Sequence, residues 1–479
     1  MRWSLCLALG IGVLAAAGGP ARAQATAEGA AKLQAALEAW QPSVGKLSLD
    51  EIVAVTPKIP VPFSVSDWRV TADGDGYRVE APGFRWLLSE ALDDRRPPFV
   101  LACDAETLRA TPLADGRFSL DSDRLVSCRL YNVGRIAAKS RRVTGTVDPA
   151  APAKTEITVT LDQATVGGVA SPVATIERLA FTRTARAAAD GRSDADAKLS
   201  ISGLSIPFPG GTGTLTVDRI LFDAGMPGID SRGLIQAAVA LAKTGGREAG
   251  PEVAALQDRL VGGLGDAGTN TLTAEGLRAV RNDVTISLGS LAIGLGYRNF
   301  TREGADATFR LDADGIATDP KWAYDAWTPT TMTVQISMED FPLWEIFADS
   351  FANRQIDEED EDRLFREARM RFLFDTVRLS APDAALDFGG AITTDPDAVL
   401  GQTGTLRMRL TGIDGLVKAL QADPQAGQAA AGLSVLQVLG RQTTTPDGRS
   451  ARDYEIVIDP SGKLLVNGAD VQALIPKEL

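Results

Sequence analysis

The feature that most limits the fold of this 479-residue chain is an alternation of apolar and polar residues, repeated along most of its length. In "TLRMRLTGI", Leu406, Met408 and Leu410 alternate with arginine and threonine, and in "MTVQISM" Val334 and Ile336 do the same. A period of two puts successive side chains of a strand on opposite faces. Asp-Gly and Pro-Gly turn sequences separate these segments. The pattern predicts antiparallel strands with one apolar and one polar face.

The alternating segments also appear in pairs, which predicts long hairpins. Three such pairs match apolar positions across a connection: Leu179 and Phe181 with Leu199 and Ile201, Leu291 and Ile293 with Phe309 and Leu311, and Val377 and Leu379 with Leu406 and Met408. We therefore expect a mainly β fold with some α-helix. Its core is an elongated, strongly curved antiparallel sheet of repeated hairpins, with short helices at the ends and along one face. Internal duplication and simple alternation both account for the repetition.

Several segments switch to helical spacing. "AAKLQAALEAWQ", "SRGLIQAAVALAKTGG", "GPEVAALQDRLVGGLGD" and "QAAAGLSVLQVLGRQ" each predict a short helix, and Leu416, Val417 and Leu420 form an apolar stripe. A helix that starts at Pro342 carries Trp344. "IDEEDEDRLFREARMRFLF" predicts a further helix over 356–374, with acids at its start and arginines later. Its acidic run over 357–362 is interpreted as a solvated helix start, and a cation site is the alternative.

The first residues predict export. Arg2 precedes an apolar run of 14 residues from Leu5 to Gly18, and Ala21 and Ala23 stand at the two small positions of a cleavage site. The run is shorter than the roughly 20 residues of a membrane-spanning helix. We expect a signal peptide cleaved after Ala23, a periplasmic location and no transmembrane segment in the mature chain. An uncleaved anchor is the alternative.

The rest of the chain divides into three parts that differ in their pattern of apolar and polar residues. Residues 24–175 form an N-terminal helix and a β-meander, 176–375 form central hairpins with a helical insertion, and 376–479 form a strand–helix–hairpin unit. We expect one continuous assembly of these parts rather than independent domains.

Composition excludes several kinds of chemistry. The chain has no histidine, which removes Ser-His and Cys-His nucleophile pairs and His-ligated metal sites. Cys103 and Cys128 remain after signal cleavage, and an oxidising compartment favours a disulfide between them over free thiols or a redox pair. The net charge of −13 argues against nucleic acid as a partner. We expect no catalytic residue, metal or cofactor.

A resemblance covers about the last hundred residues. The strand "GTLRMRLTGI", the following "GLVKAL", a second apolar helix and the final hairpin "YEIVIDPSGKLLVNG" before Pro476 resemble an uncharacterised bacterial envelope family, domain of unknown function 2125. That family has no known catalytic residues to carry over. Its strand-rich layout is in turn similar to AsmA-type envelope proteins, which implies a curved sheet with an apolar groove for lipid.

These observations lead to three functional hypotheses. The first is a periplasmic binding or carrier protein that holds an apolar ligand, a lipid or acyl chain, on a concave sheet face. Val334, Ile336, Trp344, Leu406, Met408 and Leu410 are its candidate ligand or core contacts. The second is a structural or scaffold protein that docks on an envelope protein partner. The third is a carboxylate-dependent hydrolase, which needs two facing acids in a cleft.

Overall fold

The structure is a computed structural model. It describes residues 25–41, 43–44, 63–89, 99–124, 127–130, 134–151, 155–167, 172–187, 192–243, 251–321, 323–352, 364, 368–423 and 425–471. The predicted signal peptide, its cleavage position Ala23 and the acidic run over 357–362 lie outside these residues, as does Pro476.

Strands dominate the described chain. They are β1 (Phe63–Ser64), β2 (Arg69–Asp73), β3 (Gly76–Ala81), β4 (Phe84–Ser89), β5 (Phe99–Cys103), β6 (Glu106–Pro112), β7 (Phe118–Ser122), β8 (Cys128–Leu130), β9 (Gly134–Ala137), β10 (Ser140–Val147), β11 (Thr155–Gly167), β12 (Pro172–Ala187), β13 (Ser193–Pro207), β14 (Gly213–Ile229), β15 (Gly268–Arg281), β16 (Val284–Arg298), β17 (Ala305–Asp314), β18 (Ala317–Asp319), β19 (Thr331–Phe341), β20 (Arg371–Ser380), β21 (Ala385–Thr394), β22 (Gln402–Thr411), β23 (Arg441–Thr444), β24 (Ser450–Ile458), β25 (Leu464–Val466) and β26 (Ala469–Asp470).

The helices are few and short. They are α1 (Ala27–Trp40), α3 (Ser231–Lys243), α4 (Pro251–Gly262), α5 (Leu343–Ala352), α7 (Ile413–Gln421) and α8 (Gly427–Leu439), with the single turns η3 (Pro209–Gly211) and η4 (Asp325–Trp327).

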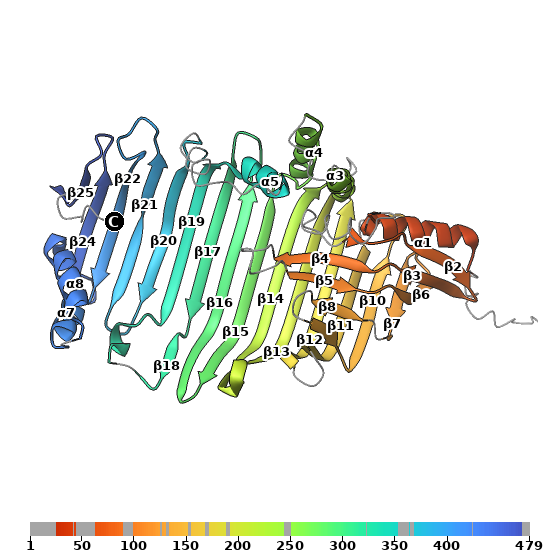
Figure 1. Ribbon diagram of the computed structural model, residues 1–479, viewed down its shortest axis with the longest axis horizontal. Helices are drawn as coiled ribbons and strands as arrows, with labels where there is room; N and C mark the ends of the chain where they lie inside the picture. Colours follow the sequence, from red (N-terminus) through yellow and green to blue (C-terminus); the bar gives the residue numbers. More distant parts are fainter. Residues whose placement is uncertain are drawn as a thin grey trace, which may run out of the picture.

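One open antiparallel sheet runs the length of the molecule, which confirms the predicted fold class (Figure 1). From β10 to β17 each strand pairs with the next along the chain, and β19 to β22 and then β24 continue the ladder. The first predicted hairpin is in register, since Leu179 lies opposite Ile201 and Phe181 opposite Leu199. The second is formed as well, with Ile293 opposite Leu311.

At its N-terminal end the sheet divides in two, because β11 pairs with both β10 and β9. One branch continues from β10 through β7, β6 and β3 to β2. The other continues from β9 through β8, β5 and β4 to β1, and it crosses in front of the main sheet (Figure 1). Phe63 of β1 accordingly lies in one buried cluster with Ala195 of β13 and Ile229 of β14.

The predicted disulfide is confirmed in the second branch. Cys103 of β5 and Cys128 of β8 are directly opposite residues, with Cα atoms 4.1 Å apart and a covalent S–S bond.

Helix α1 covers the first branch. Thr26 caps it by accepting a hydrogen bond from the backbone N–H of Gly29 at 3.0 Å. The predicted stripe of Leu33, Leu37 and Trp40 is buried against β2, β3, β6, β7 and β10. This is the largest described core, and it lies at the N-terminal end of the molecule.

A second core lies at one end of the central strands. Helices α3, α4 and α5 pack there around Leu234, Leu260 and Phe300. The ring of Trp344 stacks on Phe300 with centroids 5.4 Å apart. These helices therefore lie over the ends of the central strands rather than over the middle of the sheet (Figure 1).

Helices α7 and α8 lie at the C-terminal end of the sheet (Figure 1). Asp414 of α7 accepts hydrogen bonds from Gln437 of α8 at 2.6 Å and from Arg452 of β24 at 3.1 Å. The Tyr454 hydroxyl donates to the Leu436 carbonyl at 2.8 Å. These contacts tie both helices to β24.

Two sequence predictions are wrong. Val377 and Leu379 do not pair with Leu406 and Met408, because β21 lies between β20 and β22. The adjacent glycines at 389 and 390 give the sequence of β21 the composition of a loop, so the strand was not predicted. Residues 371–374 are strand rather than the end of a helix, since their backbone pairs with β19 and β21. The rest of that predicted helix lies largely outside the described residues.

The boundaries between the three parts predicted from the sequence do not coincide with breaks in strand pairing. The boundary at 175/176 falls inside β12 and that at 375/376 falls inside β20, and both strands pair with neighbours on each side of the boundary.

Candidate ligand-binding face of the sheet

The pairing register aligns apolar side chains of successive strands into rows across the sheet. In the central row, each residue is the direct cross-strand partner of the next, and all are apolar: Val143, Val159, Phe181, Leu199, Phe222, Leu272, Ile293, Leu311, Val334, Val377, Phe388, Met408 and Tyr454. With neighbouring strands about 4.8 Å apart, the row is roughly 60 Å long. The face that carries it is called the apolar face below.

Five of the six candidate contacts lie on the apolar face. Val334 and Met408 belong to the central row. Ile336 and Leu406 lie in the row beside it, and Leu410 lies in the row on the other side.

Trp344 does not join them. It packs in the helical core beside α4, where the Arg302 guanidinium lies 5.3 Å from its ring centroid. Its contacts are thus core contacts with Phe300 and the helices.

A line of irregular positions keeps the apolar residues of β11 to β16 on one face. Strict alternation breaks between Ile201 and Leu204, three residues apart, and both pack in one apolar cluster. The intervening Gly203 has φ +61°, and Gln163 of β11 and Gly276 of β15 have similar positive φ values at matching positions of the ladder. Each such residue shifts the alternation by one position, so the apolar residues on both sides of it lie on the same face of the sheet. The spacing of three between apolar residues is the sequence signal for this line, which sequence reasoning missed.

In the part of the chain that the structure describes, the apolar face is partly exposed between its ends. Val143 at one end of the central row and Tyr454 at the other are buried, by the N-terminal core and by α8 respectively. Every residue of the row between them is half-buried. Leu295, in the neighbouring row, is 53% exposed. Exposed apolar surfaces of this extent are uncommon in proteins and usually mark a site that binds a ligand, a membrane or another protein.

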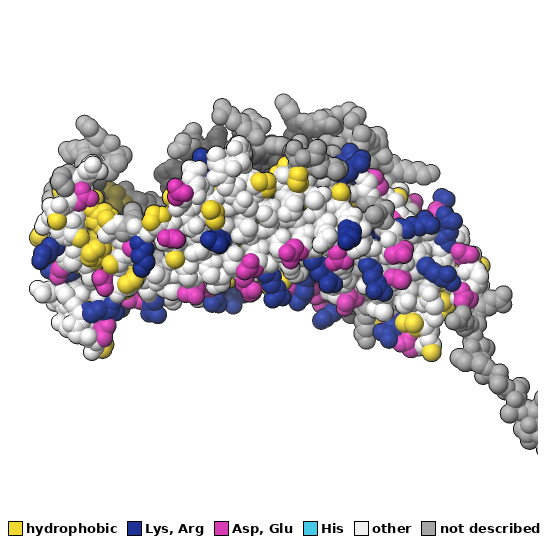
Figure 2. Space-filling model, turned by 90° about the horizontal axis from the view of Figure 1, so that it is seen from below, with side chains coloured by type: hydrophobic (Ala, Val, Ile, Leu, Met, Phe, Trp, Pro, Cys, Tyr) yellow, Lys and Arg dark blue, Asp and Glu magenta, His cyan; other side chains and the backbone are white. Residues whose placement is uncertain are grey.

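The opposite face carries charge. In the view from below, Figure 2 shows Lys and Arg interspersed with Asp and Glu along one long side of the molecule. Cross-strand ion pairs link many of them, among them Arg178–Asp162, Lys198–Asp223, Arg378–Asp387 and Arg409–Asp453. This face is suited to water, so the two faces of the sheet differ sharply in polarity.

On the charged face, a shallow cavity of about 720 Å³ lies over β20 to β24 and is lined by four arginines and four acids. The hydrogen bonds from the Arg409 guanidinium hold the pKa of Asp453 below its ordinary value. A carboxyl kept ionised in this way is a poor general acid. Among the described residues no cluster of His, Cys, Asp or Glu is arranged to hold a metal.

A smaller cavity of about 60 Å³ lies at the N-terminal end of the central row. Val143, Val159 and Phe181, the first three residues of that row, line it. Trp40 and Arg183 line it as well, with the guanidinium of Arg183 5.1 Å from the Trp40 ring centroid. Burial lowers the pKa of Arg183 to about 10, so it remains cationic at neutral pH.

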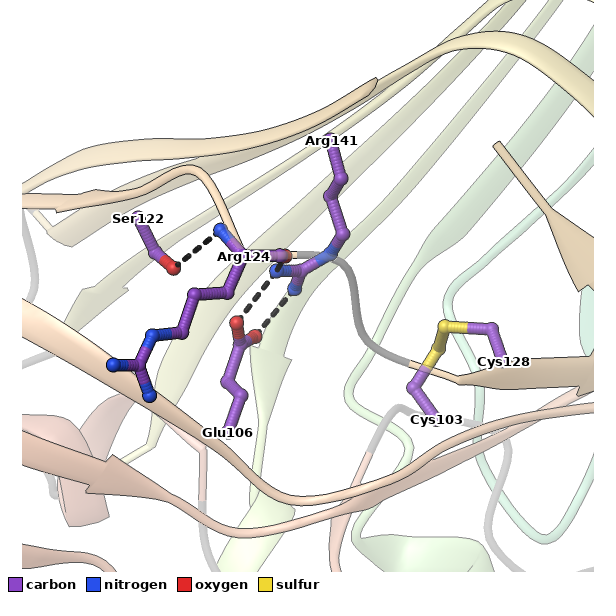
Figure 3. A network of polar contacts seen from close by, with 6 residues as sticks. All are labelled: Cys103, Glu106, Ser122, Arg124, Cys128 and Arg141. Carbon is purple, nitrogen blue, oxygen red and sulfur yellow. Dashed lines mark hydrogen bonds and ion pairs between the residues drawn. A yellow bond between two sulfur atoms is a disulfide. The ribbon is translucent and has the colours of Figure 1, made fainter. Parts of the chain in front are cut away.

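Arg141 and Glu106 complete this cavity. Arg141 reaches from β10 toward Glu106 of β6, and both guanidinium NH2 groups bond the carboxylate (Figure 3). Arg141 also donates to the Arg124 carbonyl at 3.1 Å. Its Nε–H and the indole Nε1–H of Trp40 are buried and have no hydrogen-bond acceptor among the residues that the structure describes. Sequence reasoning missed these residues, because an arginine inside an alternating strand reads as solvent-facing.

No family model, curated protein or solved structure matches this chain. Within the described residues, no helix combines the length and apolar character needed to cross a membrane.

Proposed function

We propose that this protein is a non-enzymatic periplasmic binding or carrier protein that holds a lipid acyl chain on the apolar face. The observation that carries the proposal is the central row, whose half-buried side chains continue without a polar interruption from Val159 to Met408. The resemblance to lipid-handling envelope proteins points in the same direction and stays a prediction.

The dimensions of the row suit acyl chains. One acyl chain spans about half of the roughly 30 Å hydrocarbon core of a bilayer. A row of roughly 60 Å therefore has room for several chains end to end. Burying the half-buried Leu, Ile, Val and Phe side chains under such a ligand contributes a binding free energy of about 25 cal/mol for each Å² of apolar surface removed from water. The charged face keeps the loaded protein in solution.

Native mass spectrometry of the chain, purified without detergent, tests the proposal. We expect an adduct with the mass of a fatty acid or phospholipid, lost on organic extraction. Val334→Asp puts a charge in the central row and should strongly reduce the adduct. Thr333→Asp, next to it on the charged face, is the matched control and should retain the adduct. Circular dichroism checks that both variants fold.

The second candidate is a scaffold protein that docks on an envelope partner, and α8 favours it. Val438 is 83% exposed and Val435 is 49% exposed on this apolar helix. A clean mass at the bare wild-type chain would contradict the carrier proposal. Docking through α8 would then be the remaining candidate, and Val438→Glu would be the variant to compare in pull-downs.

A further inference from the structure

We propose that the exposed side of α8 docks on the surface of a phospholipid bilayer, and that this docking lets an acyl chain pass from the bilayer onto the central row. The inference rests on the proposed function and names the partner from which the row receives its ligand. The bilayer is recognised through its apolar interior rather than through its head groups.

Over its last turns, α8 has the reverse polarity of an ordinary surface helix. Val435 is 49% exposed and Val438 is 83% exposed, and together with Ala431 they lie on one side of the helix. The polar side chain of Gln437 turns toward the protein instead, where it donates to Asp414 of α7 at 2.6 Å. A surface helix normally presents its polar side to water. The exposed side of α8 is therefore suited to an apolar surrounding.

The composition of α8 favours a bilayer over a protein as its partner. The sixteen residues from Gln425 to Gly440 include no charged or aromatic side chain. Protein interfaces depend mainly on tryptophan, tyrosine and arginine anchors, which α8 lacks. A bilayer requires only apolar area, and the strength of attachment grows with that area. Two valines with neighbouring alanines give weak, reversible docking, which is what a carrier that must leave the membrane requires.

The charge of the C-terminal end allows it to approach a membrane. From Gln402 to Val471 the chain has seven basic and seven acidic residues, whereas the whole chain has a net charge of −13. An anionic bilayer surface repels an acidic protein within about one Debye length, roughly 8 Å at physiological salt. The C-terminal end has no net charge, so it escapes the repulsion that the rest of the molecule experiences.

Helix α8 also lies at the end of the central row (Figure 1). The hydroxyl of Tyr454, the last residue of the row, donates to the Leu436 carbonyl of α8 at 2.8 Å. A bilayer in contact with Val438 therefore lies about 10 Å, one helix diameter, from the end of the row. An acyl chain spans roughly 15 Å, half of the hydrocarbon core of a bilayer. Such a chain bridges the distance while its other end is still in the bilayer.

Co-flotation of the full chain with lipid vesicles tests the docking surface. The probes are vesicles of phosphatidylcholine and vesicles of phosphatidylcholine with added phosphatidylglycerol. We expect the wild-type chain to float with both kinds and to stay bound at high salt, because the docking side of α8 has no charge. Val438→Glu should reduce the floated fraction about tenfold or more, because a charge replaces an exposed apolar side chain.

Val399→Glu is the matched control. Val399 is 74% exposed in the connection that precedes β22, at the opposite end of that strand from α7. The substitution introduces the same charge at a similarly exposed valine, so this variant should float like the wild-type chain. Both positions face water, and circular dichroism checks that both variants fold.

A second measurement separates docking from ligand binding. Transfer of labelled hexadecanoate from vesicles to the chain should be about tenfold slower in Val438→Glu than in the wild-type chain. The affinity for hexadecanoate dispersed without vesicles should not change, because Val438 lies on α8 and outside the rows of the sheet. A purely structural effect of the substitution would lower both.

The outcomes separate the two proposals. If dispersed hexadecanoate does not bind the wild-type chain, the proposed function itself fails. If it binds but the wild-type chain does not float, or Val438→Glu floats equally well, the carrier proposal stands and the docking surface is overturned. Flotation that requires phosphatidylglycerol and disappears at high salt would also overturn it, since charges elsewhere would then hold the chain. An equal loss in Val399→Glu would overturn the assignment to α8.

A protein partner is a further outcome of the same experiments. If vesicles do not bind the wild-type chain, and a purified envelope protein binds it but not Val438→Glu, then α8 docks on a protein. That result would overturn the bilayer as the partner.

Discussion

At the scale of single residues, this protein uses arginine in two environments. On the charged face, Arg409 pairs with Asp453 across neighbouring strands, and both side chains retain contact with water. In the N-terminal core, Arg141 and Arg183 are almost fully buried. An exposed pair is worth only about 0.2–1 kcal/mol. A buried guanidinium is costly unless it is paired, and Arg141 is paired with Glu106 on both carboxylate oxygens.

The exposed pair makes a pH prediction. Because Arg409 lowers the pKa of Asp453 in the folded state, this contribution to stability is complete above the unfolded pKa of about 3.9 and is lost as pH falls through the folded value. Asp453→Asn should lower the free energy of unfolding by about 0.2–1 kcal/mol at pH 7. The deficit should disappear at acidic pH. Urea unfolding at several pH values measures this. A deficit independent of pH would show that the pair contributes through packing instead.

At the scale of elements, the strands depend on a few special backbone positions. Gly276 of β15 has φ +63°, and a Cβ there would lie 2.0 Å from Asp218 Oδ2 and 2.9 Å from Asp218 Cβ. Gly294 of β16 has ordinary strand geometry, and its nearest neighbour would be Arg310 Cβ at 3.6 Å. Glycine is thus required at the first position and dispensable at the second.

Alanine substitution tests this difference. Gly276→Ala should lower the free energy of unfolding by about 1–3 kcal/mol, since it combines a strained φ with a close contact. Gly294→Ala is the matched control and should be neutral or stabilising by up to about 1 kcal/mol. Equal effects in thermal or urea unfolding would contradict the special role of the irregular line.

At the scale of the whole molecule, most strands contact only their immediate neighbours in the sheet. Such a structure can lose order at one end while the rest persists. The branch from β9 to β1 is held by few strand pairs and by the disulfide between Cys103 and Cys128. This branch crosses over the sheet near the start of the central row, so its order bears on the proposed ligand site.

Removing the disulfide should therefore act locally. Cys103→Ser with Cys128→Ser releases a loop with a sequence separation of 25 residues and should destabilise this branch by about 3 kcal/mol. Hydrogen exchange should rise in β4, β5 and β8 and stay unchanged in β16 to β20. A uniform rise over the whole sheet would show that the molecule unfolds as one cooperative unit.

What the sequence by itself determined is local. Alternation assigns each strand two faces, so the mainly antiparallel β fold, two of the three hairpins and the helices around Leu33, Trp344 and Val417 could be predicted from it. Cys103 and Cys128 could be paired because the chain offers few other thiols. Where local signals conflict, as at Gly389 and Gly390 in β21, prediction fails because glycine favours turns in isolation and strands only when paired.

What only the tertiary structure decided is alignment and burial. Backbone hydrogen bonds are alike in every register, so no local pattern states that Val334 and Met408 lie in one row. Local sequence patterns also do not predict that Arg183 lies beneath Trp40 while Arg409 faces water, since both arginines stand in alternating strands. These outcomes depend on which distant segments cover each face, α1 at one end and α7 with α8 at the other. The candidate site is a property of that packing.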